Sequence, residues 1–166
     1  MGLPADKLGG GERGCLRTIE LYRRLGIETI VVEKPTLGRG KRMFIKESLV
    51  APIKFVVTLI QESNTPVHIV GFYEHQLFYE FMIFVIAKMF GRRTTYELRN
   101  GTMVKTFNQH HWLYRRMMQF MIEHADAVLC QGQEYIEFIN RHWNAYTIYY
   151  PNYVMDKLAQ PYNENR

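Results

Sequence analysis

The stretch "PVHIVGFYEHQLFYEFMIFVIAKMFGRRTTYEL", residues 66–98, decides the fold class of this chain. Its first part, "PVHIVGF" (66–72), is a short run rich in β-branched residues, which is typical of a strand. An apolar run long enough for a central buried helix follows at 77–90, and "RRTTYEL" (92–98) is again β-branched and aromatic. Because strands joined through a helix form a right-handed crossover, the stretch predicts a βαβ unit with two parallel strands.

The same alternation continues on both sides of this unit. Upstream, residues 12–25 have the three-and-four spacing of an amphipathic helix that Gly26 ends, and "ETIVVE" (28–33) predicts a strand. Residues 46–63 predict a helix that Pro52 breaks or restarts. The downstream runs predict, in order, a helix at 110–124, a strand at 126–131, a helix at 134–143 and a strand at 145–150. We therefore expect an α/β fold with a Rossmann-like open, mostly parallel sheet and helices on both faces.

Length and composition limit the class of protein. A chain of 166 residues can bury one hydrophobic core. Hydrophobic residues make up 47% and charged residues 22%, values that exclude a disordered chain. The formal charge of +5 favours anionic partners, which are phosphates, lipid headgroups or nucleic acid, and charge alone does not choose among them.

Cysteine content and hydropathy predict the cellular compartment. Cys15 and Cys130 are the only cysteines, so we expect buried free thiols in a reducing compartment and no metal site. No secretory leader is visible at the N-terminus. The longest apolar run carries Glu80 and Lys88 and is shorter than the roughly 20 residues that span a bilayer. We expect a cytoplasmic protein, with membrane association on the cytoplasmic face as a further expectation.

A glycine-rich segment near the N-terminus, "KLGGGERGC" (7–15), has the spacing of a phosphate-binding loop. Read as Gly9-x-Gly11-x-x-Gly14 it matches the dinucleotide fingerprint, and Glu33 would then bind the ribose of NAD. The residues "PADKL" interpose a loop between any leading strand and the glycines, which that fingerprint does not allow. An NAD-binding Rossmann domain is therefore the alternative and not the leading interpretation.

Five segments resemble the N-terminal half of family 4 type glycosyltransferases of the GT-B fold. The segments are "LPADKLGGGERGCLRTIELYRRLGIETIVVE" (3–33), "PVHIVGFYEH" (66–75), "RRTTYELRNG" (92–101), "HADAVLCQGQEYIEFI" (124–139) and "IYYPNYV" (148–154). Each motif is short, and their order and spacing carry the resemblance. The resemblance implies a retaining transferase with a nucleotide-sugar donor as substrate, a glycan, lipid-linked or other hydroxyl acceptor, and no resident cofactor.

The resemblance also implies a division into domains. Residues 1–155 would form the acceptor-side Rossmann-like domain, with its first strand missing or truncated, and residues 156–166 a tail or the start of a linker. The resemblance also implies that the C-terminal domain, which binds most of the donor in such enzymes, would be absent from this chain. We therefore expect this chain alone to transfer no sugar.

The candidate phosphate-binding residues are Gly9, Gly10, Gly11 and Arg13. Three consecutive glycines before a helix allow the backbone to approach a ligand closely, so the N–H groups would face the donor phosphates. A flexible turn near a terminus is the structural alternative. Arg13 is a weaker candidate at the helix start.

The remaining candidates lie where predicted strands end, because open α/β sheets bind ligands at that edge. Glu97, the candidate catalytic residue, would orient an acceptor hydroxyl, and Arg99 would hold an anionic group; a local Glu–Arg ion pair is the alternative. Glu74 and His75 would line the cleft or serve as a capping carboxylate and a structural histidine. Asn152 would lie in the interdomain turn, although Tyr153 replaces the glycine that is usual there.

Residues 38–60 mix cations with Phe44, Ile45 and Phe55, a combination that suits docking on an anionic bilayer. Helices that cover a sheet need the same apolar residues, so packing is the alternative interpretation. A third class of function is a non-catalytic basic binding module for lipid or nucleic acid. Nucleic acid is not the expected partner.

Overall fold

The computed structural model describes residues 10–35, 41–71, 76–99 and 103–151. Its described part falls into two units, residues 10–29 with Pro151, and residues 30–150, and each unit is described by itself. Four predicted site residues, Gly9, Glu74, His75 and Asn152, lie outside the described residues.

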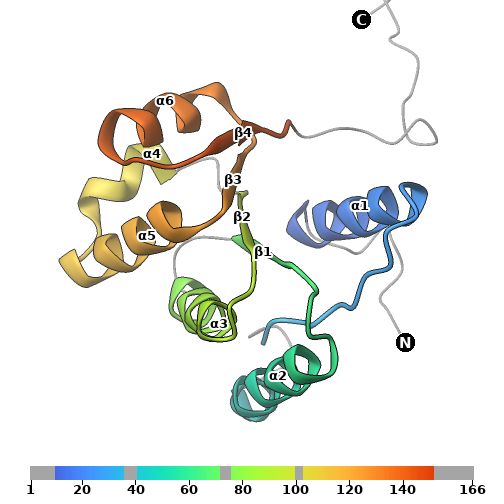
Figure 1. Cartoon of the computed structure of the whole chain (residues 1–166). Helices are drawn as coiled ribbons and strands as arrows, with labels where there is room; N and C mark the ends of the chain where they lie inside the picture. Colours follow the sequence, from blue (N-terminus) through green and yellow to red (C-terminus); the bar gives the residue numbers. More distant parts are fainter. Residues whose placement is uncertain (1–9, 36–40, 72–75, 100–102, 152–166) are drawn as a thin grey trace, which may run out of the picture. The chain divides into compact units, whose positions relative to one another are not determined.

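From α2 onward, helical segments and strands alternate along the chain (Figure 1). The first unit holds α1 (Gly10–Arg24). The second unit contains, in order, α2 (Lys41–Gln61), β1 (Val67–Gly71), α3 (Leu77–Met89), β2 (Thr94–Leu98), α4 (Met103–Thr106), the short 3-10 helix η4 (Phe107–Gln109), α5 (Trp112–His124), β3 (Ala127–Cys130), α6 (Gln133–His142) and β4 (Thr147–Tyr149). The predicted elements from β1 onward are confirmed to within a few residues, and α4 with η4 was not predicted.

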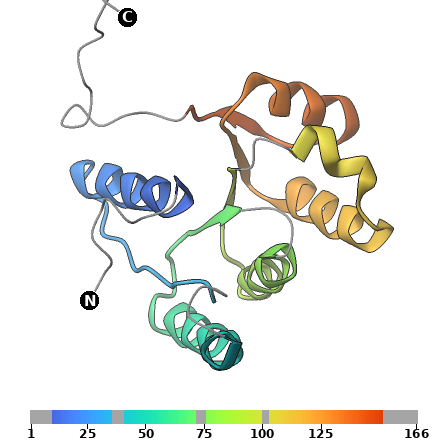
Figure 2. The ribbon, with the colours of Figure 1, turned by 180° about the vertical axis from the view of Figure 1, so that it is seen from behind.

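The four strands form one parallel sheet in the order β1-β2-β3-β4. Val70 pairs with Glu97, Tyr96 with Val128, and Leu129 with Ile148. Since the strands advance in one direction and right-handed crossovers join them, α3, α5 and α6 lie on one face of the sheet (Figures 1 and 2). The predicted fold class, α/β with an open parallel sheet flanked by helices, is confirmed.

Most of the hydrophobic core lies between that face and the three helices. From the sheet, Ile69, Tyr96 and Val128 point into the core, and Phe84 and Met118 meet them from α3 and α5. All five side chains are buried. Because successive strand residues alternate between faces, Glu97 points to the opposite face of the sheet from Tyr96.

Helix α2 runs through Pro52, so the predicted break at this proline is wrong. Ala51, Phe55 and Leu59 are buried and spaced four residues apart, which places them on one stripe of the helix. Packing of this stripe keeps the helix continuous although Pro52 lacks a backbone N–H. The sequence had indicated Phe55 as a residue for docking on a bilayer. The structure places Phe55 in the core, so it is not available for docking.

The segment "ETIVVE" (28–33) forms no strand, so this prediction is also wrong. A β-branched run becomes a strand only when a neighbouring strand accepts its backbone hydrogen bonds, and among the described strands β1 pairs with β2 alone. Ile30 and Val31 are 54% and 57% exposed, and only Val32 packs against the core.

Both cysteines are free thiols. Cys130 is buried, as predicted, and burial raises its pKa to about 12. Cys15, on α1, is only half-buried, so the prediction of a buried thiol is wrong at this position. None of the helices in the described residues combines the length and the apolar character that a membrane crossing requires.

Candidate functional site

The candidate site is a polar cluster on β1 and β2, on the face of the sheet opposite the core. Glu97 is the penultimate residue of β2, and Arg99 follows the strand directly. His68 comes from β1, where the parallel register places it diagonally across from Glu97. The cluster therefore depends on the pairing of two strands that are distant in sequence.

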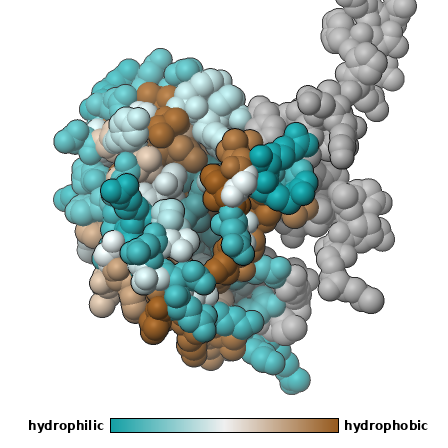
Figure 3. Space-filling view, turned by 45° about the vertical axis from the view of Figure 1, so that its right-hand side comes forward, coloured by the Kyte–Doolittle hydropathy of each residue, from teal (hydrophilic) through white to brown (hydrophobic). Residues whose placement is uncertain are grey.

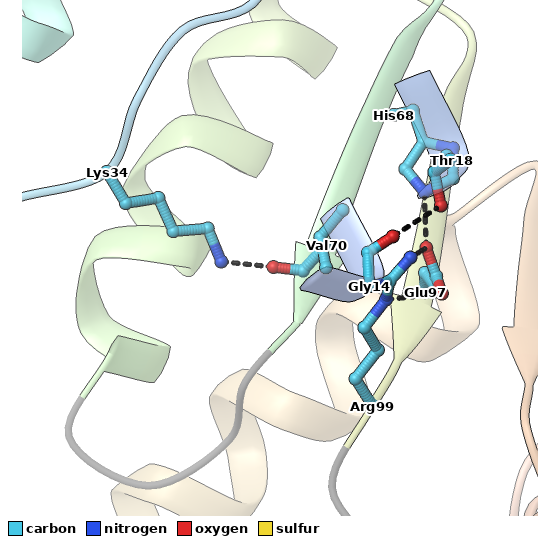
Figure 4. A network of polar contacts seen from close by, with 7 residues as sticks. All are labelled: Gly14, Thr18, Lys34, His68, Val70, Glu97 and Arg99. Carbon is cyan, nitrogen blue, oxygen red and sulfur yellow. Dashed lines mark hydrogen bonds and ion pairs between the residues drawn. The ribbon is translucent and has the colours of Figure 1, made fainter. Parts of the chain in front are cut away.

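Glu97 holds the cluster together through its carboxylate (Figure 4). Arg99 binds it with both arms of its guanidinium, Nε to Oε1 at 2.5 Å and Nη2 to Oε2 at 3.0 Å. His68 Nε2 lies 2.9 Å from Oε2. The side chain of Glu97 is fully buried, and those of Arg99 and His68 are 6% and 16% exposed.

The electrostatic balance keeps Glu97 ionised. Burial raises the pKa of a carboxyl group, but the hydrogen bonds from His68 and Arg99 outweigh this effect and hold the pKa of Glu97 below its ordinary value. An ionised carboxylate only accepts hydrogen bonds, so the His68 nitrogen that faces it carries a proton. Glu97 thus fixes both the tautomer of His68 and the direction of the Arg99 guanidinium.

The variant Glu97→Gln tests this charge state through the pH dependence of stability. We expect it to lower the free energy of unfolding by about 2 kcal/mol at neutral pH, because a buried charge pair is broken. Since folding lowers the pKa of Glu97, its charge contributes stability that is complete above the ordinary value of 4.5 and is lost as the pH falls through the lowered value. Urea unfolding at several pH values measures the difference.

In that experiment the stability difference between the wild type and Glu97→Gln should shrink on acidification. A difference that stays constant through the acid range would show that Glu97 is already protonated in the folded chain at neutral pH.

A second buried cluster supports the same two strands from the core side. Glu80 of α3 is fully buried, and its Oε2 accepts a hydrogen bond from the Tyr96 hydroxyl at 2.9 Å. Its Oε1 forms an ion pair with Lys34 Nζ at 2.6 Å. Lys34 also donates to the carbonyl of Val70, on the edge of β1 that faces away from β2 (Figure 4). Glu80 and Lys34 therefore fix the carboxyl halves of β1 and β2.

The structure brings together two of the predicted site residues, Glu97 and Arg99, in the ion pair that was the alternative interpretation. Gly10 and Gly11 belong to the first turn of α1, so the predicted helix start at Glu12 is two residues late and these two glycines are not loop residues. The N–H groups of a first helical turn have no partner within the helix, and α1 keeps this property. Arg13 also lies within α1, where Thr18 donates to the carbonyl of Gly14 (Figure 4).

His68 was not predicted as a site residue. The run "VHIVG" reads as an apolar strand, and one histidine in it carries no signal of its own. The available signal is strand alternation, which places His68 on the face opposite Ile69. Its pairing with Glu97 depends on the strand register, which the sequence does not contain.

The positions of Glu33, Gly11 and Gly14 do not match those that an NAD-binding fingerprint requires. A dinucleotide fingerprint needs an acidic residue at the end of the second strand to bind the ribose. Glu33 is exposed and follows no strand, and Gly11 and Gly14 lie inside α1.

Within residues 10–35, 41–71, 76–99 and 103–151, no three His, Cys, Asp or Glu side chains converge in a way that could hold a metal ion. Comparisons with profiles of known protein families, with curated proteins and with solved structures find no match to this chain. The site is therefore interpreted from its own residues.

Proposed function

We propose that this chain forms the acceptor-side domain of a nucleotide-sugar-dependent, retaining glycosyltransferase of the GT-B type. One observation carries the proposal: four of the five segments that resemble this family contribute neighbouring parallel strands in chain order, while the first, 3–33, contributes α1 and no strand among its described residues. These four contribute β1 (from 66–75), β2 (from 92–101), β3 with α6 (from 124–139) and β4 (from 148–154).

The placement of Glu97 and Arg99 supports the same proposal. Parallel sheets of this kind bind ligands outside the carboxyl ends of their strands, and Arg99 directly follows β2. A guanidinium at this edge attracts phosphates and other anionic groups. Glu97 is then a positioning residue that holds Arg99 and His68, because its ionised carboxylate already accepts three hydrogen bonds.

In the proposed reaction this domain contributes orientation and electrostatics. The acceptor hydroxyl would be held at the sheet edge while it attacks the anomeric carbon of the donor, on the face from which the nucleoside diphosphate leaves. The nucleotide-sugar is a substrate, and no resident cofactor is part of the proposal. The acceptor is a glycan, a lipid-linked saccharide or another hydroxyl compound.

The test compares two arginines at opposite ends of β2. The wild type, Arg99→Lys and Arg93→Lys are titrated by calorimetry with oligosaccharides, saccharide phosphates, and UDP- and GDP-hexoses. Arg93 is exposed and precedes β2, so it lies at the amino end of the same strand. We expect one saccharide class to bind and Arg99→Lys to weaken it about tenfold, because lysine cannot keep the two hydrogen bonds to Glu97 that position the cation at the sheet edge. Arg93→Lys should leave the affinity unchanged.

Two results would contradict the proposal. The first is equal loss of affinity in both variants. The second is an absence of saccharide binding together with salt-sensitive binding of oligonucleotides, which would favour a basic binding module.

A further inference from the structure

Helix α2 has an outward face of large apolar side chains. Leu49, Ile53 and Ile60 are 67%, 64% and 64% exposed, and Val50 and Val57 are 36% and 45% exposed. At 3.6 residues per turn these five positions fall within an arc of about 100°. Figure 3 shows hydrophobic surface among hydrophilic residues at the lower end of the view, the level at which α2 lies in Figure 1.

Packing within the described residues does not explain this face. The inward stripe of Ala51, Phe55 and Leu59 already attaches α2 to the protein, and it lies on the other side of the helix. A surface helix of a globular protein is normally polar on its outer side. A contiguous exposed apolar face marks a surface that contacts something else.

Charge indicates what that surface contacts. Arg42 and Lys46 are exposed and fall within the same arc, at the N-terminal end of the face, and Lys54 is exposed at its flank. Glu47 is the only acidic residue of α2, and it is half-buried and outside the arc. The face is therefore apolar and cationic, without an exposed carboxylate among the described side chains of α2.

Two other occupants fit this pattern less well. A second copy of the chain, related by a two-fold axis through the middle of this face, would bring Lys54 close to its own symmetry mate and would offer Arg42 and Lys46 no carboxylate of α2 within the face. A nucleic acid would meet aliphatic side chains where it needs donors to phosphate. An anionic lipid surface accepts both features, because the aliphatic side chains enter the acyl boundary while the cations contact the headgroups.

We propose that α2 docks this protein on the surface of an anionic bilayer. Leu49, Ile53, Val57 and Ile60 insert, and Arg42, Lys46 and Lys54 bind the headgroups. The inference rests on α2 alone and does not depend on the reaction that the sheet edge supports. The docking residues differ from those that the sequence had indicated, because Phe55, one of them, lies in the core.

The test is co-sedimentation of the 166-residue chain with vesicles of phosphatidylcholine, with and without phosphatidylglycerol. We expect binding to the phosphatidylglycerol vesicles that weakens with added salt, and little binding to phosphatidylcholine alone. The double variant Ile53→Gln/Ile60→Gln should bind at least about tenfold more weakly, because two inserted side chains become polar. Lys46→Gln and Lys54→Gln should each weaken binding roughly fivefold.

The matched control is Leu25→Gln. Leu25 is 64% exposed, the same as Ile53 and Ile60, but it lies outside α2. It should bind vesicles as the wild type does, and circular dichroism should show all variants folded. Equal binding to both kinds of vesicle would overturn the inference, and so would a loss of binding in Leu25→Gln equal to that of the α2 variants. It would also be overturned if the wild type bound no vesicles but self-associated, and the α2 variants abolished that self-association.

Discussion

Gly71→Val should be the most damaging single substitution in the sheet. A β-carbon at this position would lie 2.6 Å from Cζ and from the hydroxyl oxygen of Tyr96, because the tyrosine ring crosses the backbone of Gly71. Both residues are buried, so neither can move into solvent. We expect a loss of about 3–5 kcal/mol in the free energy of unfolding, from overpacking and from displacement of the Tyr96 hydroxyl from Glu80.

Alanine substitutions give the matched comparison for this prediction. Gly71→Ala adds only the β-carbon and should still cost about 2 kcal/mol, measured by urea unfolding with tryptophan fluorescence. Gly132→Ala adds the same atom where the nearest neighbour is 3.4 Å away, and it should cost less than about 1 kcal/mol. Equal effects of the two alanine variants would show that the Tyr96 ring does not cross Gly71.

Glu80→Leu should produce the second large effect. The substitution leaves the Lys34 ammonium and the Tyr96 hydroxyl without the carboxylate that accepts from both. Because the side chain of Glu80 is fully buried and that of Lys34 is 20% exposed, breaking this pair should cost about 3 kcal/mol. Equilibrium unfolding in urea measures the loss.

A double-mutant cycle separates the ion pair from simple packing. Lys34→Met/Glu80→Leu removes both charges and should recover much of the loss, because an apolar pair replaces a buried ion pair at little cost. The control is Lys88→Met, since Lys88 pairs with Asp126 at a surface where the two side chains are 30% and 49% exposed, and it should change stability by less than about 1 kcal/mol. A Glu80→Leu variant as stable as the wild type would refute the structural role of the pair.

The fold follows from local sequence patterns where each element has its own periodicity. The runs at 66–72 and 92–98 are β-branched and short, and the helix between them is apolar throughout, so β1, α3 and β2 are predictable. The run at 28–33 has the same composition but forms no strand, because strand formation also needs a partner that the run does not specify. Helix α2 shows the converse case, in which tertiary packing overrides the local preference of Pro52.

The candidate site is only partly predictable for a related reason. The position of Glu97 and Arg99 at the end of a strand follows from the pattern, and their ion pair follows from their spacing. His68 joins them through strand register, and Lys34 reaches Glu80 over 46 residues of sequence. Such contacts depend on the folded sheet and not on any local pattern.

The central claim is that a saccharide ligand binds at the carboxyl ends of the strands. Amide chemical shifts of the isotope-labelled chain, followed during titration with the saccharide panel, test it most directly. The account predicts saturable shifts at Arg99, Gln131 and Gly132, which follow β2 and β3, and unchanged shifts at Arg93 and Asp126, which precede them. Shifts that appear at the preceding residues instead, or no saturable shift with any saccharide, would contradict it.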